Sequence, residues 1–191
     1  MVQSVILYLH GFRSSPASSK AQRLRARMCE RGLGELFICP QLPVSATAAI
    51  ALADRLIAAA RTPVTLIGSS LGAYYAAHLA EKHRLRAVLV NPAVIAHVSL
   101  AEYLGSQTNL YTGQEFQFTP AHIAELQAIE VPQLSHPDHF WLLVETGDEL
   151  LDYRLAVARY AGARQTVIEG GDHSFTHWDD YLDELIQSAG L

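Results

Sequence analysis

The fold can be inferred from one pentapeptide, Gly68-Ser69-Ser70-Leu71-Gly72. It fits the G-x-S-x-G pattern of a nucleophile elbow, a tight turn that joins a strand to a helix and presents a serine. Glycine is required two residues before and after that serine, because a Cβ atom there would collide with the neighbouring strand or helix. Ser70 meets this requirement, whereas Ser69 does not, since residue 67 is isoleucine.

The residues on both sides of the pentapeptide supply the context that the motif needs. Residues 64–67 are apolar or β-branched and lie between a proline and a glycine, as in a buried strand. Residues 71–83 predict a helix, with alanine and leucine on one face and basic residues in the last turn. This order of strand, turn and helix favours a reactive serine at Ser70, with a small-residue turn that carries no chemistry as the alternative.

The remainder of the chain alternates short apolar segments with helical ones. Strands are predicted at residues 5–9, 36–39, 64–67, 87–90, 140–145 and 165–168, and helices at 18–31, 46–60, 71–83, 150–161 and 175–189. Strands separated by helices of about ten or more residues indicate βαβ units. We therefore expect an α/β fold, a three-layer α/β/α sandwich with a mainly parallel sheet of about six strands, in a single domain over residues 1–191.

One segment, residues 92–138, interrupts this alternation. It shows no convincing strand, but short helices are expected at residues 100–104 and 121–129. A connection of this length is unusual between consecutive strands. The segment is interpreted either as a small cap-like insertion over the site or as an ordinary crossover with long loops.

The composition limits the classes of function. The chain has 191 residues and a net charge of −5, with 50% hydrophobic and 17% charged residues, so a globular protein is expected. No dense basic run favours nucleic acid, and the longest apolar stretch is too short for a bilayer. The two cysteines form neither a disulfide framework nor a CxxC pair. We expect a cytoplasmic protein with no nucleic-acid or membrane partner, and the oligomeric state stays open.

A serine hydroxyl attacks only when a base takes its proton, so Ser70 requires a histidine and an acid that orients it. Around this type of elbow, the acid and then the histidine follow the serine along the chain, each after a strand. Of nine histidines, His173 has this position, in a glycine-rich loop after residues 165–168. Asp148 follows the strand at 140–145, and we expect it to orient His173 and to stabilise the imidazolium.

Other assignments of these residues are open. Three carboxylates compete with Asp148: Glu149, Asp152 and Asp172. Asp172 adjoins the histidine and would reach its Nδ1 with difficulty, and Asp152 is better placed to cap a helix. A metal site at His173 and His177 is a weaker alternative, since two ligands lack a third. We expect no metal and no cofactor.

An acyl-transfer site also needs two backbone N–H groups to hold the oxyanion. One is the amide of Leu71, directly after the serine and at the start of a helix. The other is expected in the loop after the first strand, Leu9-His10-Gly11-Phe12, with the Phe12 amide as the donor. Arg13 beside this loop is a candidate to meet an anionic group of a substrate.

These motifs together resemble the α/β-hydrolases, and specifically the small YqiA-type bacterial esterases. The similarity covers almost the whole chain and includes Leu7-Tyr8-Leu9-His10-Gly11-Phe12, Pro40-Gln41-Leu42-Pro43, Ile67-Gly68-Ser69-Ser70-Leu71-Gly72, Val90-Asn91-Pro92-Ala93-Val94, Tyr111-Thr112-Gly113-Gln114, Thr146-Gly147-Asp148-Glu149, Leu151-Asp152-Tyr153-Arg154 and Gln165-Thr166-Val167-Ile168-Glu169-Gly170-Gly171. Two departures are Ala73, where glycine is expected, and Asp172, where asparagine is expected.

The resemblance implies a minimal α/β-hydrolase fold and a serine esterase with a Ser70–His173–Asp148 triad. It implies hydrolysis of small-molecule acyl esters with short chains, and of acyl thioesters in a wider reading, with no metal or cofactor. An alternative is a catalytically inactive protein that keeps the fold as a binding or scaffold module. The sequence does not identify the substrate.

Overall fold

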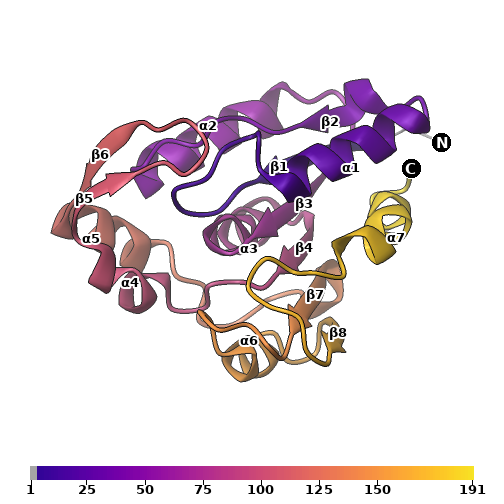
Figure 1. Cartoon of the computed structure of the whole chain (residues 1–191). Coiled ribbons are helices and arrows are strands. Elements are labelled where there is room, and N and C mark those ends of the chain that lie inside the picture. Colours follow the sequence, from indigo (N-terminus) through magenta and orange to yellow (C-terminus); the bar gives the residue numbers. More distant parts are fainter. Residues whose placement is uncertain (1–3) are drawn as a thin grey trace.

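The computed structural model of the chain describes residues 4–191. Six parallel strands form one sheet in the order β2-β1-β3-β4-β7-β8 (Figure 1). Their bounds are β1 (Val5–Leu9), β2 (Phe37–Ile38), β3 (Val64–Ser69), β4 (Arg86–Val90), β7 (Phe140–Glu145) and β8 (Arg164–Ile168). The expected α/β/α architecture with a parallel six-stranded sheet is confirmed, although β2 is two residues shorter than residues 36–39.

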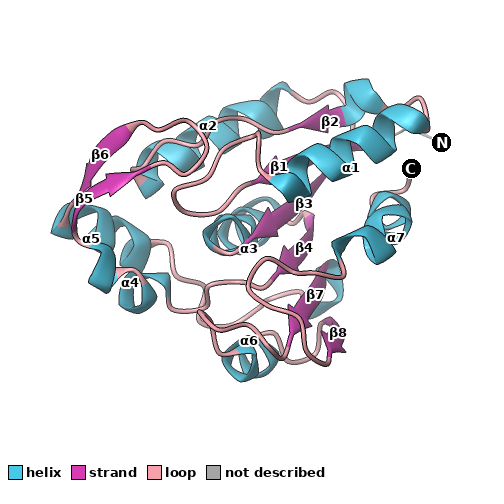
Figure 2. Cartoon of the chain, in the orientation of Figure 1, coloured by secondary structure: helices cyan, strands magenta, loops and turns pink. Residues whose placement is uncertain are grey.

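Helices cover both faces of the sheet (Figure 2). One face packs against α1 (Ser19–Glu30) and α7 (Leu182–Ser188), and the other against α2 (Ala46–Ala59), α3 (Leu71–His83) and α6 (Tyr153–Arg159). Successive strand residues point to opposite faces, so that Ile6 and Tyr8 pack toward α1 while Leu7 and Leu9 pack toward α3. Burial on both faces explains why the inner strands β1, β3, β4 and β7 are mostly apolar.

The last two predicted helices are shorter than the sequence indicated. Helix α6 begins at Tyr153 rather than at residue 150, because Asp152 caps it, and α7 begins at Leu182 rather than at residue 175. Residues before α7 form a loop and a short 3-10 helix instead. The 3-10 helices among residues 4–191 are η1 (Gly34–Leu36), η2 (Ala101–Tyr103), η3 (Pro137–His139) and η4 (Trp178–Tyr181).

The segment at 92–138 contains two strands that the sequence did not predict. It forms α4 (Ala96–Ser99), η2, β5 (Gly105–Thr108), β6 (Glu115–Phe118) and α5 (Pro120–Ala128), and β5 and β6 pair as an antiparallel hairpin. The helix expected at 121–129 is present as α5, whereas that expected at 100–104 is replaced by α4 and η2. Figure 1 shows this segment beside the main sheet, next to the loop after β1.

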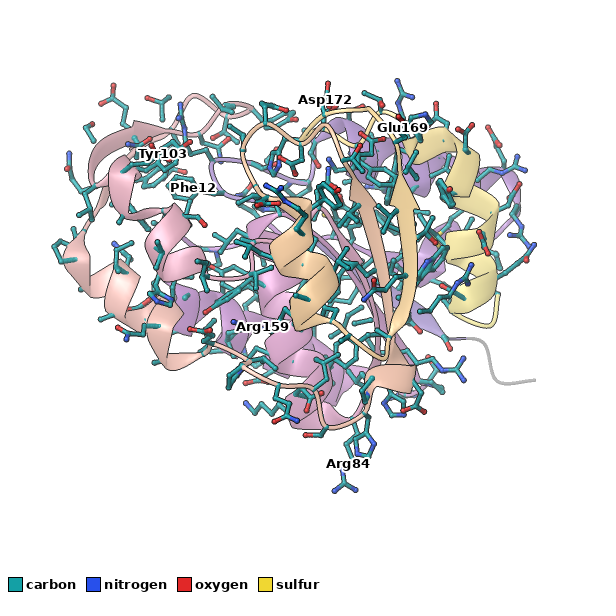
Figure 3. All side chains as sticks on the ribbon, turned by 90° about the horizontal axis from the view of Figure 1, so that it is seen from below. Phe12, Arg84, Tyr103, Arg159, Glu169 and Asp172 are labelled. Carbon is teal, nitrogen blue, oxygen red and sulfur yellow. The ribbon has the colours of Figure 1, made fainter. Side chains whose placement is uncertain are left out.

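The carboxyl ends of the parallel strands share one edge of the sheet. Figure 3 shows the two edges: Asp172, in the loop after β8, lies at one, and Arg84, just before β4, lies at the other. Loops that follow β1, β3, β4, β7 and β8 therefore meet, which is where α/β sheets bind ligands. Within residues 4–191, no helix has the length and apolar character needed to cross a membrane.

Candidate active site

Ser70 lies in the turn between β3 and α3, in a strained backbone conformation with φ 56° and ψ −121°. Its N–H donates to the carbonyl of Val90 at 3.0 Å. A Cβ atom on Gly68 would lie 2.3 Å from the Gly72 carbonyl oxygen, and one on Gly72 would lie 1.9 Å from that of Leu9. Both glycines are thus required by close backbone contact, as the elbow motif predicts.

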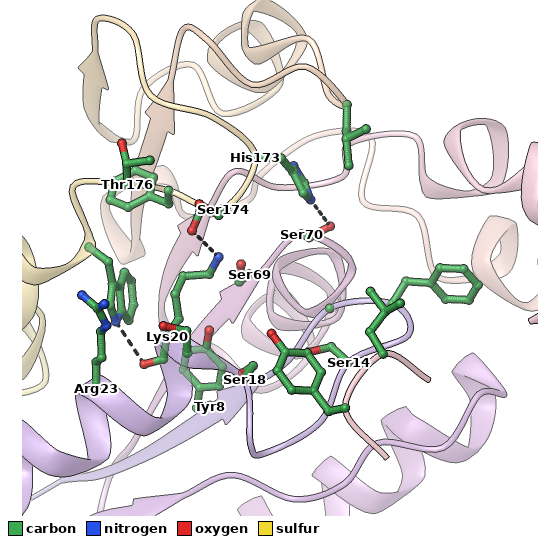
Figure 4. Close-up of a pocket in the computed structure, with 18 of the residues that line it drawn as sticks. Tyr8, Ser14, Ser18, Lys20, Arg23, Ser69, Ser70, His173, Ser174 and Thr176 are labelled. Carbon is green, nitrogen blue, oxygen red and sulfur yellow. Dashed lines mark hydrogen bonds between the residues drawn. The ribbon is translucent and has the colours of Figure 1, made fainter. Parts of the chain in front are cut away.

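The structure brings together the three residues predicted to form a triad. The Nε2 atom of His173 lies 3.1 Å from Ser70 Oγ (Figure 4). Its Nδ1 lies 2.8 Å and 3.0 Å from the two oxygens of Asp148. Asp148 Oδ1 also accepts the N–H groups of Leu150 and Leu151, both at 2.9 Å. Because a carboxylate only accepts, the proton of the neutral imidazole belongs on Nδ1, which leaves Nε2 free to accept from the serine.

The three competing carboxylates have other partners. Glu149 accepts the backbone N–H of His173 at 3.0 Å, and Asp152 accepts a backbone N–H at the start of α6. Asp172 accepts the N–H of Ser174 at 2.7 Å. None of the three is hydrogen-bonded to the imidazole ring within residues 4–191, whereas Asp148 is.

Sequence reasoning missed Glu145, the last residue of β7. Its side chain is fully buried and accepts the N–H groups of Asp172 at 2.7 Å, Thr176 at 3.1 Å and His177 at 2.9 Å. The Thr176 hydroxyl and His177 Nδ1 donate to it as well, at 3.1 Å and 2.7 Å. Burial raises the pKa of Glu145, but these hydrogen bonds, those of His177 foremost, outweigh burial and hold its pKa below the ordinary value. This carboxylate therefore organises the loop that carries His173.

Asn91, directly after β4, supports the same loop from the other side. It is buried with φ 39°, and its Oδ1 accepts the N–H of Glu145 at 3.0 Å. Its Nδ2 donates to the carbonyls of Asp172 at 3.0 Å and His173 at 3.3 Å. The sequence carried a signal for both residues, since a polar side chain at the end of a fully apolar strand needs a buried partner.

The two expected oxyanion donors, Phe12 and Leu71, line one small cavity of about 30 Å³ together with Gly11. Neither amide N–H finds an acceptor within residues 4–191. The loop before Phe12 is anchored by the buried His10, whose Nε2 accepts the N–H of Leu42 at 3.0 Å while Nδ1 lies 3.0 Å from the Gly11 carbonyl. Burial lowers the pKa of His10, which keeps the ring neutral and able to accept.

The hairpin β5–β6 fixes the other end of this loop. The ring of Phe12 contacts those of Tyr103 and Phe118, with centroids 5.7 Å and 5.0 Å apart, and Figure 3 shows Phe12 beside Tyr103. Arg13 lines the same small cavity as Phe12 and Leu71, and its Nε donates to the Thr108 carbonyl at 3.0 Å. This hydrogen bond joins the loop to the hairpin, and a contact of Arg13 with a substrate anion stays a prediction.

A cavity of about 650 Å³ opens onto Ser70 and His173. Besides these two residues, its walls come from the loop after β1, the start of α1, the hairpin turn and the loops after β7 and β8 (Figure 4). Within residues 4–191, no three His, Cys, Asp or Glu side chains are grouped so that they could hold a metal ion. His177, the proposed alternative metal ligand, is bound to Glu145 instead.

Comparison with known proteins gives the family of this chain. Residues 5–189 match the model of an uncharacterised protein family, UPF0227. A protein from Agrobacterium vitis S4 superposes with a TM-score of 0.76 at 18% identity, covering 98% of this chain and 88% of that chain. Mouse α/β-hydrolase domain-containing protein 10 gives 0.71 at 18% identity, over 95% and 89% of the two chains. The Paleococcus ferrophilus monoacylglycerol lipase superposes with a TM-score of 0.69 at 14% identity, covering 98% of this chain and 96% of that chain. The chain therefore belongs to the YqiA-like family UPF0227 and has the α/β-hydrolase fold.

Proposed function

We propose that this protein is a serine hydrolase that cleaves short acyl esters, and acyl thioesters by the same route. The observation that carries the proposal is the continuous hydrogen-bonded series from Ser70 Oγ through His173 to the Asp148 carboxylate, at 3.1 Å and 2.8 Å. A hydrogen-bonded base of this kind, itself oriented by an acid, activates a serine hydroxyl.

In the first half of the proposed reaction, Ser70 Oγ attacks the ester carbonyl carbon as His173 Nε2 takes the hydroxyl proton. The tetrahedral oxyanion accepts hydrogen bonds from the free N–H groups of Phe12 and Leu71. Leu71 lies at the start of α3, where the helix dipole also favours negative charge. The imidazolium, stabilised by Asp148, then gives its proton to the leaving alkoxide or thiolate, and the acyl group stays on Ser70.

In the second half, a water molecule replaces the alcohol. His173 takes a proton from this water, whose oxygen attacks the acyl carbon. The second tetrahedral intermediate then collapses: the bond from the acyl carbon to Ser70 Oγ breaks, Oγ takes the proton from His173 Nε2, and a carboxylic acid is released. The cavity of about 650 Å³ has the size of a small-molecule site. The lipase among the similar structures adds support for ester substrates, as a likeness in fold.

A panel of 4-nitrophenyl esters and acyl thioesters of graded chain length, together with a fluorophosphonate probe, tests the proposal. We expect Ser70→Ala to lose hydrolysis by about three orders of magnitude or more and to lose labelling. Ser69→Ala is the matched control, since it alters the adjacent serine without touching the triad, and it should still be labelled. Equal rates for wild type and Ser70→Ala would refute the assignment.

The same experiment distinguishes the second candidate, an inactive protein that uses the fold for binding. In that case the wild type would neither turn over the panel nor react with the probe. The free Phe12 and Leu71 amides and the strained Ser70 favour the enzyme, because strain of this kind persists where a turn must present a side chain.

A further inference from the structure

The cavity beside Ser70 has a cationic wall that the proposed chemistry does not use. Ser18 and Lys20, at the start of α1, line it opposite His173 (Figure 4). The rim is apolar: Leu110, Tyr111 and Leu150 also line the cavity and are exposed by 69%, 49% and 58%. A ligand that fits both parts carries an apolar portion and a compact negative charge.

Lys20 is the main feature of this wall. Its ammonium donates to the Ser174 carbonyl at 2.7 Å, and no carboxylate lies within 4 Å of it in the part of the chain that the structure describes. An ammonium has three N–H donors, so two are left for a ligand. Burial lowers the pKa of Lys20 to about 8, against the opposing charges of Asp172, Glu145 and Asp148, so the side chain is still mostly protonated at neutral pH.

The nearby carboxylates do not satisfy this cation. Glu145 and Asp148 are held by the hydrogen bonds described above, and Asp172 accepts both the N–H and the hydroxyl of Ser174. Arg23, further along the same helix and also on the cavity wall, pairs with Asp179 on the surface. Lys20 is thus the cation of the wall that has no carboxylate partner among residues 4–191.

Ser18 provides an independent observation. It is the N-cap residue of α1 and is 8% exposed, yet its hydroxyl makes no cap hydrogen bond and is buried without any partner among residues 4–191. The N–H groups of Ser19, Lys20 and Ala21 likewise have no acceptor there, and no acidic residue lies in the first turn. By contrast, the Ser45 hydroxyl caps α2 by accepting the Ala48 N–H at 3.1 Å. A buried unpaired hydroxyl beside free amides calls for an acceptor from outside the chain.

We propose that this wall binds an anionic group, a carboxylate or a phosphate, on the ester that Ser70 cleaves, with Lys20 as the specificity-determining residue. The anion accepts from the Lys20 ammonium, the Ser18 hydroxyl and the first amides of α1, while the ester carbonyl lies at Ser70. This inference rests on the proposed hydrolase function and narrows its substrate class to amphiphilic acyl esters.

The kinetic test compares two esters of equal chain length, mono-4-nitrophenyl glutarate and neutral 4-nitrophenyl pentanoate. In Lys20→Met, the ratio of kcat/KM for the anionic ester to that for the neutral ester should fall about tenfold or more, the usual effect of one lost charge-assisted hydrogen bond. The control Lys82→Met removes a lysine that pairs with Asp54 away from the cavity, and its ratio should stay at the wild-type value. If the ratio is unchanged in Lys20→Met, the proposal is overturned. This includes the case in which kcat/KM falls equally for both esters because the loop at Ser174 has shifted.

A binding test separates this inference from the proposed function. Calorimetric titrations of wild type and Ser70→Ala with monomethyl glutarate and with methyl phosphate distinguish carboxylate from phosphate as the preferred group. We expect one of the two anions to bind both proteins. Adding Lys20→Met to either protein should weaken the affinity for that anion about tenfold or more, and adding Ser18→Ala should weaken it by a smaller factor. If an anion binds and its binding depends on Lys20, but the protein hydrolyses no ester, then only the proposed hydrolase function is refuted. No binding of either anion at millimolar concentration, or binding indifferent to Lys20, would refute the anion site.

Discussion

Replacing Glu145 by glutamine tests whether this buried carboxylate organises the loop of His173. One of its oxygens accepts two backbone N–H groups, those of Asp172 and Thr176, and the other accepts those of His177 together with the Thr176 hydroxyl. An amide has one oxygen and one NH₂ group, so in either orientation NH₂ faces N–H donors. Each buried donor left without an acceptor costs about 1–3 kcal/mol. With two donors affected, we expect the free energy of unfolding to fall by about 2–6 kcal/mol.

Urea unfolding at neutral pH measures this loss, and ester hydrolysis measures its consequence for His173. A displacement of the loop by a fraction of an ångström should lower kcat by about tenfold or more. The control is Glu184→Gln, whose carboxylate pairs with Arg164 on the surface, where both side chains are about half exposed. This control should change the free energy of unfolding by less than about 1 kcal/mol. If Glu145→Gln is as stable and as active as Glu184→Gln, the assigned role is wrong.

The pH dependence supplies an independent check on the same residue. The folded-state pKa of Glu145 lies below the ordinary value of 4.5, so its charge contributes stability above pH 4.5. That contribution is lost as pH falls through the folded-state pKa, where the carboxylate takes a proton. The difference in stability between wild type and Glu145→Gln should therefore narrow as pH falls below 4.5, and a constant difference would contradict the argument.

Three further predictions concern other parts of the site. Asp148→Asn should lower kcat about 10⁴-fold in steady-state assays, because an amide favours the wrong imidazole tautomer, and a decrease below tenfold would exclude Asp148 as the acid. Gly72→Ala should lower the free energy of unfolding by more than about 3 kcal/mol, since its Cβ would lie 1.9 Å from a carbonyl oxygen; wild-type stability in urea would contradict this contact. Burial holds the pKa of His10 below its ordinary value of 6.5, so the unfolded chain takes up a proton first and stability should fall as pH drops below 6.5. This slope should be smaller in His10→Gln, and equal slopes would show that His10 does not contribute.

The parts of the fold that were predicted correctly depend on local patterns. The strands β1, β3, β4 and β7 are mostly apolar and buried, and the elbow glycines are forced by close contacts with neighbouring backbone. Hairpin β5–β6 was missed because β5, Gly105–Thr108, is exposed and polar, and such a strand is held by its backbone pairing. Only Phe116 and Phe118 in β6 alternate as a half-buried strand should, and four residues are too few to distinguish this pattern from a loop.

The site shows the same division between local and long-range information. Chain order alone led to the prediction of Ser70, Asp148 and His173, which the structure places in hydrogen-bond contact, because each follows a strand that ends at the same edge. The role of Glu145 depends on five donors, from Asp172, Thr176 and His177, that lie 27 to 32 residues further along the chain. No local pattern specifies such a contact, although the burial of an acid at a strand end implies that partners exist.

The two halves of the site are supported by separate scaffolds, and this separation has a mechanistic consequence. Glu145 and Asn91 hold the loop of His173, whereas the aromatic contact of Phe12 with Phe118 holds the oxyanion loop against the hairpin. Proton transfer and oxyanion stabilisation are therefore open to independent perturbation. Loss of the Phe118 ring should weaken the hydrogen bonds that stabilise the oxyanion. Because these hydrogen bonds reach full strength only in the transition state, the loss should lower kcat more than it raises KM. Because the ring packs against Phe12 and His122 and takes no part in the hydrogen bonds of His173, the pH profile of kcat should keep its wild-type shape, in contrast to changes at Asp148.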